Sequence, residues 1–144
     1  MRHQIKAFVL IALVAMGLPV ALVAQPADYF WTSPSHNSME SMPCGGHDIG
    51  LNVWVENSDL LFYVSRSGVF DENNAMLKLG RFRIRLTPLL DTAGSFRQTL
   101  HVNDGYMTVT DGQKKITLWV DVFKPVVHVE IESGAPLVAE CDYE

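Results

Sequence analysis

The sequence has few basic residues. Its 144 residues include 11 lysines and arginines against 16 acidic residues, which gives a net charge of −5. Nucleic-acid binding depends on Lys and Arg contacts to phosphate, and anionic lipid head groups attract the same side chains. The acidic balance therefore argues against both kinds of ligand. Repeats and low-complexity stretches are also missing, and the length suits one ordinary domain.

Cysteine is scarce, with only Cys44 and Cys141. No CxxC or Cys/His spacing occurs, so we expect neither a zinc site nor another metal or cofactor. A disulfide between the two would close a loop of about a hundred residues, for which the chain-entropy model credits about 4–5 kcal/mol. Two buried thiols, or a partner cysteine beyond this chain, are the alternatives, and the sequence leaves the pairing open.

Catalytic motifs are missing as well. The chain has no Gly-rich phosphate loop, no EF-hand spacing and no Ser/His/Asp arrangement. Four histidines lie far apart, none beside a plausible nucleophile: His36, His47, His101 and His128. Glu130 and Glu132 share a strand face, but nothing else marks them as the carboxylate pair of a glycosidase. We predict no catalytic residue in this chain.

The one long apolar run lies at the amino terminus. Two basic residues precede Ala7–Leu18, Pro19 follows the run, and Ala24 offers a small residue for cleavage. An uncleaved anchor is the alternative, since an 18-residue stretch nearly reaches the roughly 20 residues that span a bilayer, but Gly17 and Pro19 break it. We predict that residues 1–24 form a helical signal peptide. The mature protein is then exported to the periplasm or beyond and keeps no membrane segment.

Residues 25–47 are rich in Ser, Pro, Asn, Gly and Met, which predicts an irregular lead-in. The rest of the chain, 48–144, consists of short strand-like runs punctuated by turn residues. The predicted strands are Ile49–Glu56, Asp59–Ser65, Leu79–Leu86, Phe96–Val102, Tyr106–Thr110, Lys115–Phe123 and Val126–Glu132. Because no amphipathic helix is evident, we predict an all-β antiparallel sandwich, supersandwich-like, over 48–144. We expect this domain to be truncated after Cys141–Glu144.

The predicted loop between Arg66 and Met76 is polar and holds Asp71, Glu72, Asn73 and Asn74. Such oxygens suit calcium or sugar hydroxyls, but a solvated loop is the favoured interpretation. Of the tryptophans, Trp54 and Trp119 lie in apolar runs and are predicted to be core. Trp31 lies in the lead-in and is the candidate binding platform.

The runs WTSPSHNSMESMPCGGHDIGLNVWVENSDLLFYVSRSGVFDENN, LKLGRFRIRL and LWVDVFKPVVHVEIES carry a family resemblance. Over Asp28–Glu144 the chain resembles domain-of-unknown-function family 5703, found at the amino terminus of large exported bacterial proteins proposed to be glycoside hydrolases. It is also similar to the amino-terminal β-sandwich of glycoside hydrolase family 95. There, a Gly-rich turn such as Met42–Leu51 leads into the sandwich.

The resemblance implies a sandwich that packs on a separate catalytic (α/α)₆ domain, whose acid and base residues have no counterpart in this chain. It therefore implies a non-catalytic accessory domain of a carbohydrate-active enzyme, with loops that reach the partner domain or a glycan. The residues expected at such contacts are Trp31, Asn37, Asp48, Asp71, Glu72 and Asn73. An independent carbohydrate-binding module and a purely structural sandwich are the alternatives. Exposed aromatic side chains on one face would favour the carbohydrate-binding module, whereas an unpaired apolar patch would favour the accessory domain.

Overall fold

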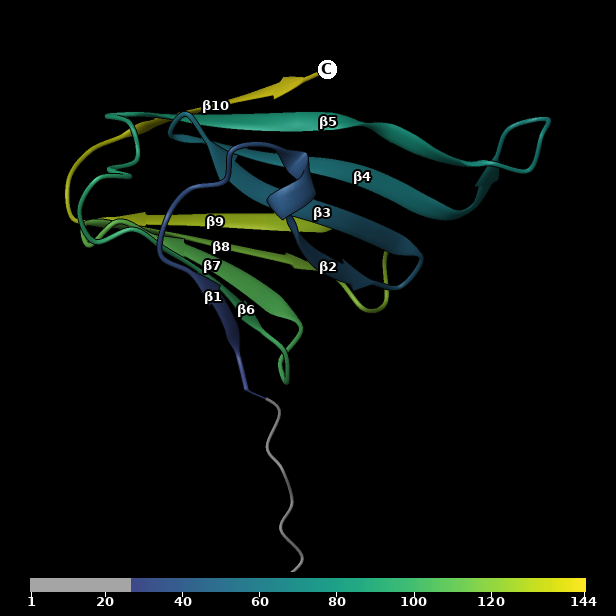
Figure 1. The fold of residues 1–144 in the computed structure, drawn as a ribbon, viewed down its shortest axis with the longest axis horizontal. Helices are drawn as coiled ribbons and strands as arrows, with labels where there is room; N and C mark the ends of the chain where they lie inside the picture. The colour runs from purple at the N-terminus through teal and green to yellow at the C-terminus, as the bar shows by residue number, and fades with distance from the viewer. Residues whose placement is uncertain (1–26) are drawn as a thin grey trace, which may run out of the picture.

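The computed structural model describes residues 27–144 (Figure 1). The predicted signal peptide, 1–24, lies outside the described residues. Within 27–144 the chain forms ten β-strands and one short 3₁₀ turn, η1 (Ser38–Glu40), and no α-helix. No helix in this range is long and apolar enough to cross a membrane.

The strands form two antiparallel five-stranded sheets that lie one above the other (Figure 1). Sheet A has the order β1 (Tyr29–Trp31), β6 (Arg97–His101), β7 (Tyr106–Thr110), β8 (Lys114–Val120) and β9 (Val127–Ser133). Sheet B has the order β10 (Val138–Tyr143), β5 (Met76–Thr87), β4 (Asp59–Phe70), β3 (Ile49–Glu56) and β2 (Met42–Gly46). The predicted all-β antiparallel sandwich is confirmed.

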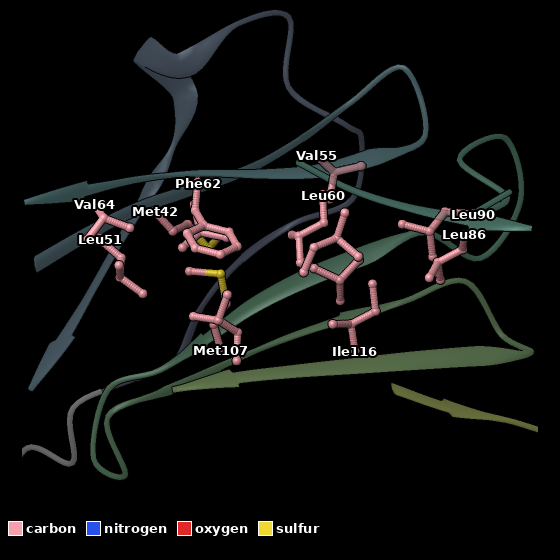
Figure 2. Close-up of a cluster of buried hydrophobic side chains, with 14 of the residues drawn as sticks. Met42, Leu51, Val55, Leu60, Phe62, Val64, Leu86, Leu90, Met107 and Ile116 are labelled. Carbon is pink, nitrogen blue, oxygen red and sulfur yellow. The ribbon is translucent and has the colours of Figure 1, made fainter. Parts of the chain in front are cut away.

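Alternation along the strands builds the core between the sheets. In β5, Ile84 and Leu86 are buried, while Arg83 and Arg85 alternate with them on the outer face. Figure 2 shows side chains of the two sheets that point toward one another, such as Phe62 from sheet B and Met107 and Ile116 from sheet A. These apolar layers hold the sandwich together.

Turn residues set where several strands end. Asn57 and Ser58 have φ of 52° and 66°, as a two-residue hairpin turn between β3 and β4 requires. Gly105 and Gly112 also have positive φ, of 71° and 87°. Each glycine follows an aspartate, and both Asp-Gly steps lie at turns between strands.

The prediction of an irregular lead-in over 25–47 is wrong in part, because β1 and β2 lie in it. Both are edge strands, and an edge strand tolerates Pro43 because its missing N–H can face outward. The third unpredicted strand, β10, is also an edge strand. The predicted loop 66–76 is shorter than expected, since β4 continues to Phe70 and β5 begins at Met76.

The sequence leaves the pairing of the two cysteines open, and in the structure they lie apart. Cys44 lies on β2 and Cys141 on β10, the two opposite edges of sheet B, and both thiols are free. Four strand spacings of about 4.8 Å separate these edges by roughly 19 Å. A disulfide needs Cα atoms only about 4.4–6.8 Å apart.

Candidate functional site

Two of the predicted contact residues have structural roles in the lead-in. The indole Nε1 of Trp31 donates to the carbonyl of Glu40 at 2.9 Å, and its side chain remains partly exposed. The Asn37 side chain accepts the Met39 N–H at 2.9 Å and so caps η1. Both residues position the segment that leads from β1 to β2.

Asp48 lies at the turn between β2 and β3. Its carboxylate accepts from Arg66 Nε at 2.6 Å and lies 2.8 Å from His47 Nδ1. The Arg66 guanidinium, assisted by His47, lowers the pKa of the Asp48 carboxyl group. This ion pair joins the β2–β3 turn to β4.

The polar cluster occupies the tip of the β4–β5 hairpin, which extends beyond the neighbouring strands (Figure 1). Asp71 Oδ1 accepts the N–H groups of Asn73 and Ala75, both at 2.8 Å. Glu72 and Asn73 are exposed. Among residues 27–144, no group of three His, Cys, Asp or Glu side chains could hold a metal ion. The tip is thus a self-bonded turn, remote from the lead-in.

The predicted residues do not converge on one site. Two grooves on the described surface have volumes above 600 Å³, and none of the predicted contact residues lines either. The first, the edge groove, opens between the sheets at their β9 and β10 edges and has a volume of about 630 Å³. Its apolar lining includes Phe62, Val64, Ile84, Val129, Ile131 and Cys141. Every residue of β10 is exposed, so this side of the core is not closed.

The second groove, the ring groove, lies on the outer face of sheet A and has a volume of about 620 Å³. Its lining includes Tyr106, Lys115, Thr117, Trp119, Phe123 and Glu130. The prediction that Trp119 belongs to the core is wrong, because it shares the outer face with Lys115 and Thr117 and is partly exposed. Trp54, by contrast, is buried as predicted.

A row of four rings crosses sheet A at the ring groove. Register places His101 opposite Tyr106, Tyr106 opposite Trp119, and Trp119 opposite His128. His101 stacks on Tyr106 at 4.3 Å and His128 stacks on Trp119 at 4.8 Å between ring centroids. Each histidine therefore covers one side of an aromatic ring.

At one end of this row, a carboxylate, an imidazole and a hydroxyl group are linked in the order found in a hydrolase triad. Asp28 Oδ2 lies 2.8 Å from His101 Nδ1, and Thr108 Oγ1 lies 3.1 Å from His101 Nε2. Thr108 is buried in the middle of β7, which pairs with strands on both sides, so its surroundings lack free N–H groups for an oxyanion. The arrangement fixes the imidazole and supports Tyr106.

Sequence reasoning missed both grooves. The ring groove had a readable signal, because Trp119 occupies the same alternating positions as Lys115 and Thr117 rather than those of Ile116 and Leu118. The edge groove had none, since it depends on which distant strands become sheet edges.

The fold and its grooves define a two-sheet antiparallel β-sandwich domain with an open edge. A model of the family described as "Domain of unknown function (DUF5703)" matches residues 30–144, in the form of that family's amino-terminal domain. The chain belongs to this family. Searches of curated proteins and of solved structures gave no match. The similarity to glycoside hydrolase family 95 stays a prediction.

Proposed function

We propose that this chain is the non-catalytic amino-terminal accessory domain of an exported carbohydrate-active enzyme. In this proposal the edge groove binds the catalytic (α/α)₆ domain and so helps to shape its active site. The observation that carries the proposal is the open apolar side of the sandwich between β9 and β10. Monomeric domains rarely leave a core open to water in this way unless the surface binds something.

The occupant that we propose for the edge groove is the catalytic domain rather than a second copy of the chain. β10 forms the rim of the edge groove, and Glu144 is tied to Arg81 and Arg83 of β5. A domain joined after Glu144 would therefore start at the groove. The β4–β5 hairpin adds the exposed apolar side chains Phe70, Leu77 and Leu79 beside the tip that holds Asp71.

The first test is to read the coding sequence beyond Glu144. A continuation that encodes an (α/α)₆ domain is expected, and its absence would overturn the proposal. Mass spectrometry of the exported protein should show Gln25 as the first residue. Retention of residues 1–24 would contradict the predicted cleavage.

The second test measures docking by titrating this chain with the separately expressed catalytic domain. Ala139→Glu places a charge in the edge groove and should weaken binding at least tenfold, because the carboxylate would be buried unpaired. Val138→Glu is the matched control, since it adds the same charge to an exposed position that does not line the groove. Equal affinities for both variants would remove the groove from the proposal, and self-association without domain binding would favour a dimer.

The predicted loop contacts have their own test. Asp48→Ala and Asp71→Ala should each reduce glycan hydrolysis or domain docking in the complete enzyme. Unchanged stability, docking and hydrolysis in both variants would remove these residues from the contact surface.

A further inference from the structure

We propose that the ring groove binds a neutral oligosaccharide, with one sugar ring packed against Tyr106 and Trp119. The site is independent of domain docking, because the ring groove lies on the outer face of sheet A and the edge groove between the sheets. An isolated chain should therefore bind the sugar even if the docking proposal fails.

The aromatic rings supply the apolar part of the site. His101 and His128 cover one side of Tyr106 and Trp119 respectively, and both aromatic residues line the groove. Phe123, which is 84% exposed, lines it from the β8–β9 loop. A pyranose ring presents a flat C–H face that packs against such rings, and water leaves both surfaces on binding.

Polar side chains beside the rings supply the hydrogen bonds. Thr117 and Glu130 lie next to each other across β8 and β9, and both line the groove. Within residues 27–144, neither side chain makes a hydrogen bond to another protein group. The Thr117 hydroxyl both donates and accepts hydrogen bonds, and the Glu130 carboxylate accepts them. A sugar hydroxyl can also do both, so it can bond to either side chain. Sugar hydroxyls match this pair.

The charges of the groove exclude anionic ligands. Lys115 is its one lysine, and its Nζ is held by Glu132 at 2.7 Å. Asp104, Asp121 and Glu130 are the acidic residues in the lining. Phosphates and acidic peptides would therefore meet a net negative surface.

The paired strands beneath the groove disfavour strand addition by an extended peptide. β7 and β8 each have hydrogen-bonded neighbours on both sides, so the floor of the groove offers no free strand edge. An amine ligand remains the chemical rival, because carboxylates and aromatic rings also attract cations. A quaternary ammonium probe in the test below distinguishes an amine ligand from a sugar.

The support beneath the rings makes the site rigid before any ligand binds. His101 is fixed by Asp28 and Thr108, and His128 lies 3.7 Å from the Asp121 carboxylate. Aromatic rings held in this way lose little conformational entropy on binding.

The test titrates the full chain with cellohexaose, xylohexaose, mannohexaose and laminarihexaose, with calorimetry and tryptophan fluorescence as readouts. At least one hexasaccharide should bind and change the fluorescence. Trp119→Ala and Tyr106→Ala should each weaken binding about tenfold or more, and Glu130→Gln by about 2–10-fold. Trp31→Ala is the matched control, because that indole lies outside the groove, and its affinity should equal that of the unchanged chain.

Circular dichroism checks that each variant is folded. Glu130→Gln changes an exposed side chain and therefore leaves the core intact. Failure of all four sugars to bind would overturn the proposal, as would binding that survives Trp119→Ala. Binding of tetramethylammonium with loss of affinity in Trp119→Ala and Glu130→Gln, but no sugar binding, would replace it with an amine site.

Discussion

Asp111 anchors the loop between β5 and β6 from a buried position. Its carboxylate accepts the N–H groups of Asp91, Gln113 and Lys114, and Lys114 Nζ lies 2.9 Å from Oδ2. Burial opposes ionisation of this carboxyl group. The hydrogen bonds from Asp91, Lys114 and Gln113 outweigh it and lower the pKa of Asp111 to about 2.

This depressed pKa predicts a stability loss in acid. The contribution of Asp111 is fully present above its ordinary pKa of 3.8 and is lost as the pH falls toward about 2. The shift corresponds to about 2 kcal/mol. At neutral pH, Asp111→Asn should lower the free energy of unfolding, measured with urea, by about that amount. In acid, the free energy of unfolding of the variant should fall less than that of the original chain. The exposed Asp142→Asn is the control, and equal stability of both variants would contradict the account.

Gly80 is a second residue whose identity the structure requires. Its φ is +149°, and a Cβ atom there would overlap the ring of Tyr143. Tyr143 belongs to β10 and lies opposite Phe82 of β5. Gly80→Ala should therefore reduce the free energy of unfolding by about 1–3 kcal/mol in urea. Tyr143→Ala in the same chain should restore part of the loss. If the single variant were as stable as the original chain, the packing of Tyr143 on β5 would be wrong.

At the scale of elements, strands with clear alternation and turn boundaries could be predicted from the sequence. β3 and β7 begin and end as expected because turn residues bound them. β2 could not be predicted, since Pro43 and Gly45 read locally as loop and only pairing with β3 makes this segment a strand. β10 depends likewise on pairing with β5, far away in the sequence.

The candidate site was predictable only in part. The family resemblance placed Asp48 and Asp71 at contacts, yet their carboxylates serve a local ion pair and a local turn. Trp119 was misassigned because an apolar run was read without its alternation. The edge groove depends on how two sheets stack, a long-range property that no short pattern encodes.

The separation of the two cysteines yields a prediction about the sheet edges. Cys44 on β2 and Cys141 on β10 cannot pair without breaking sheet B. Protein prepared under oxidising conditions should therefore have the same thermal unfolding midpoint with and without a reductant, as measured by calorimetry. A clear drop on reduction would show that the edges of sheet B meet.

At the scale of the whole molecule, β9 separates the two proposed surfaces. Val127, Val129 and Ile131 line the edge groove, whereas His128 stacks on Trp119 and Glu130 lines the ring groove. Alternation along one strand thus places an apolar docking surface and a polar, aromatic binding surface on opposite faces. A sandwich with this arrangement can hold a catalytic partner on one side and a glycan on the other.

The alkylation rate of Cys141 tests the docking claim most directly. Cys141 is exposed and lines the edge groove, whereas Cys44 is half-buried on the opposite edge, where burial raises the pKa of its thiol. In a Cys44→Ser background, a maleimide should modify Cys141 rapidly in the isolated chain. In the complete protein the rate should fall at least tenfold if, as proposed, a catalytic domain covers the groove. Equal rates in the isolated chain and the complete protein would contradict the account.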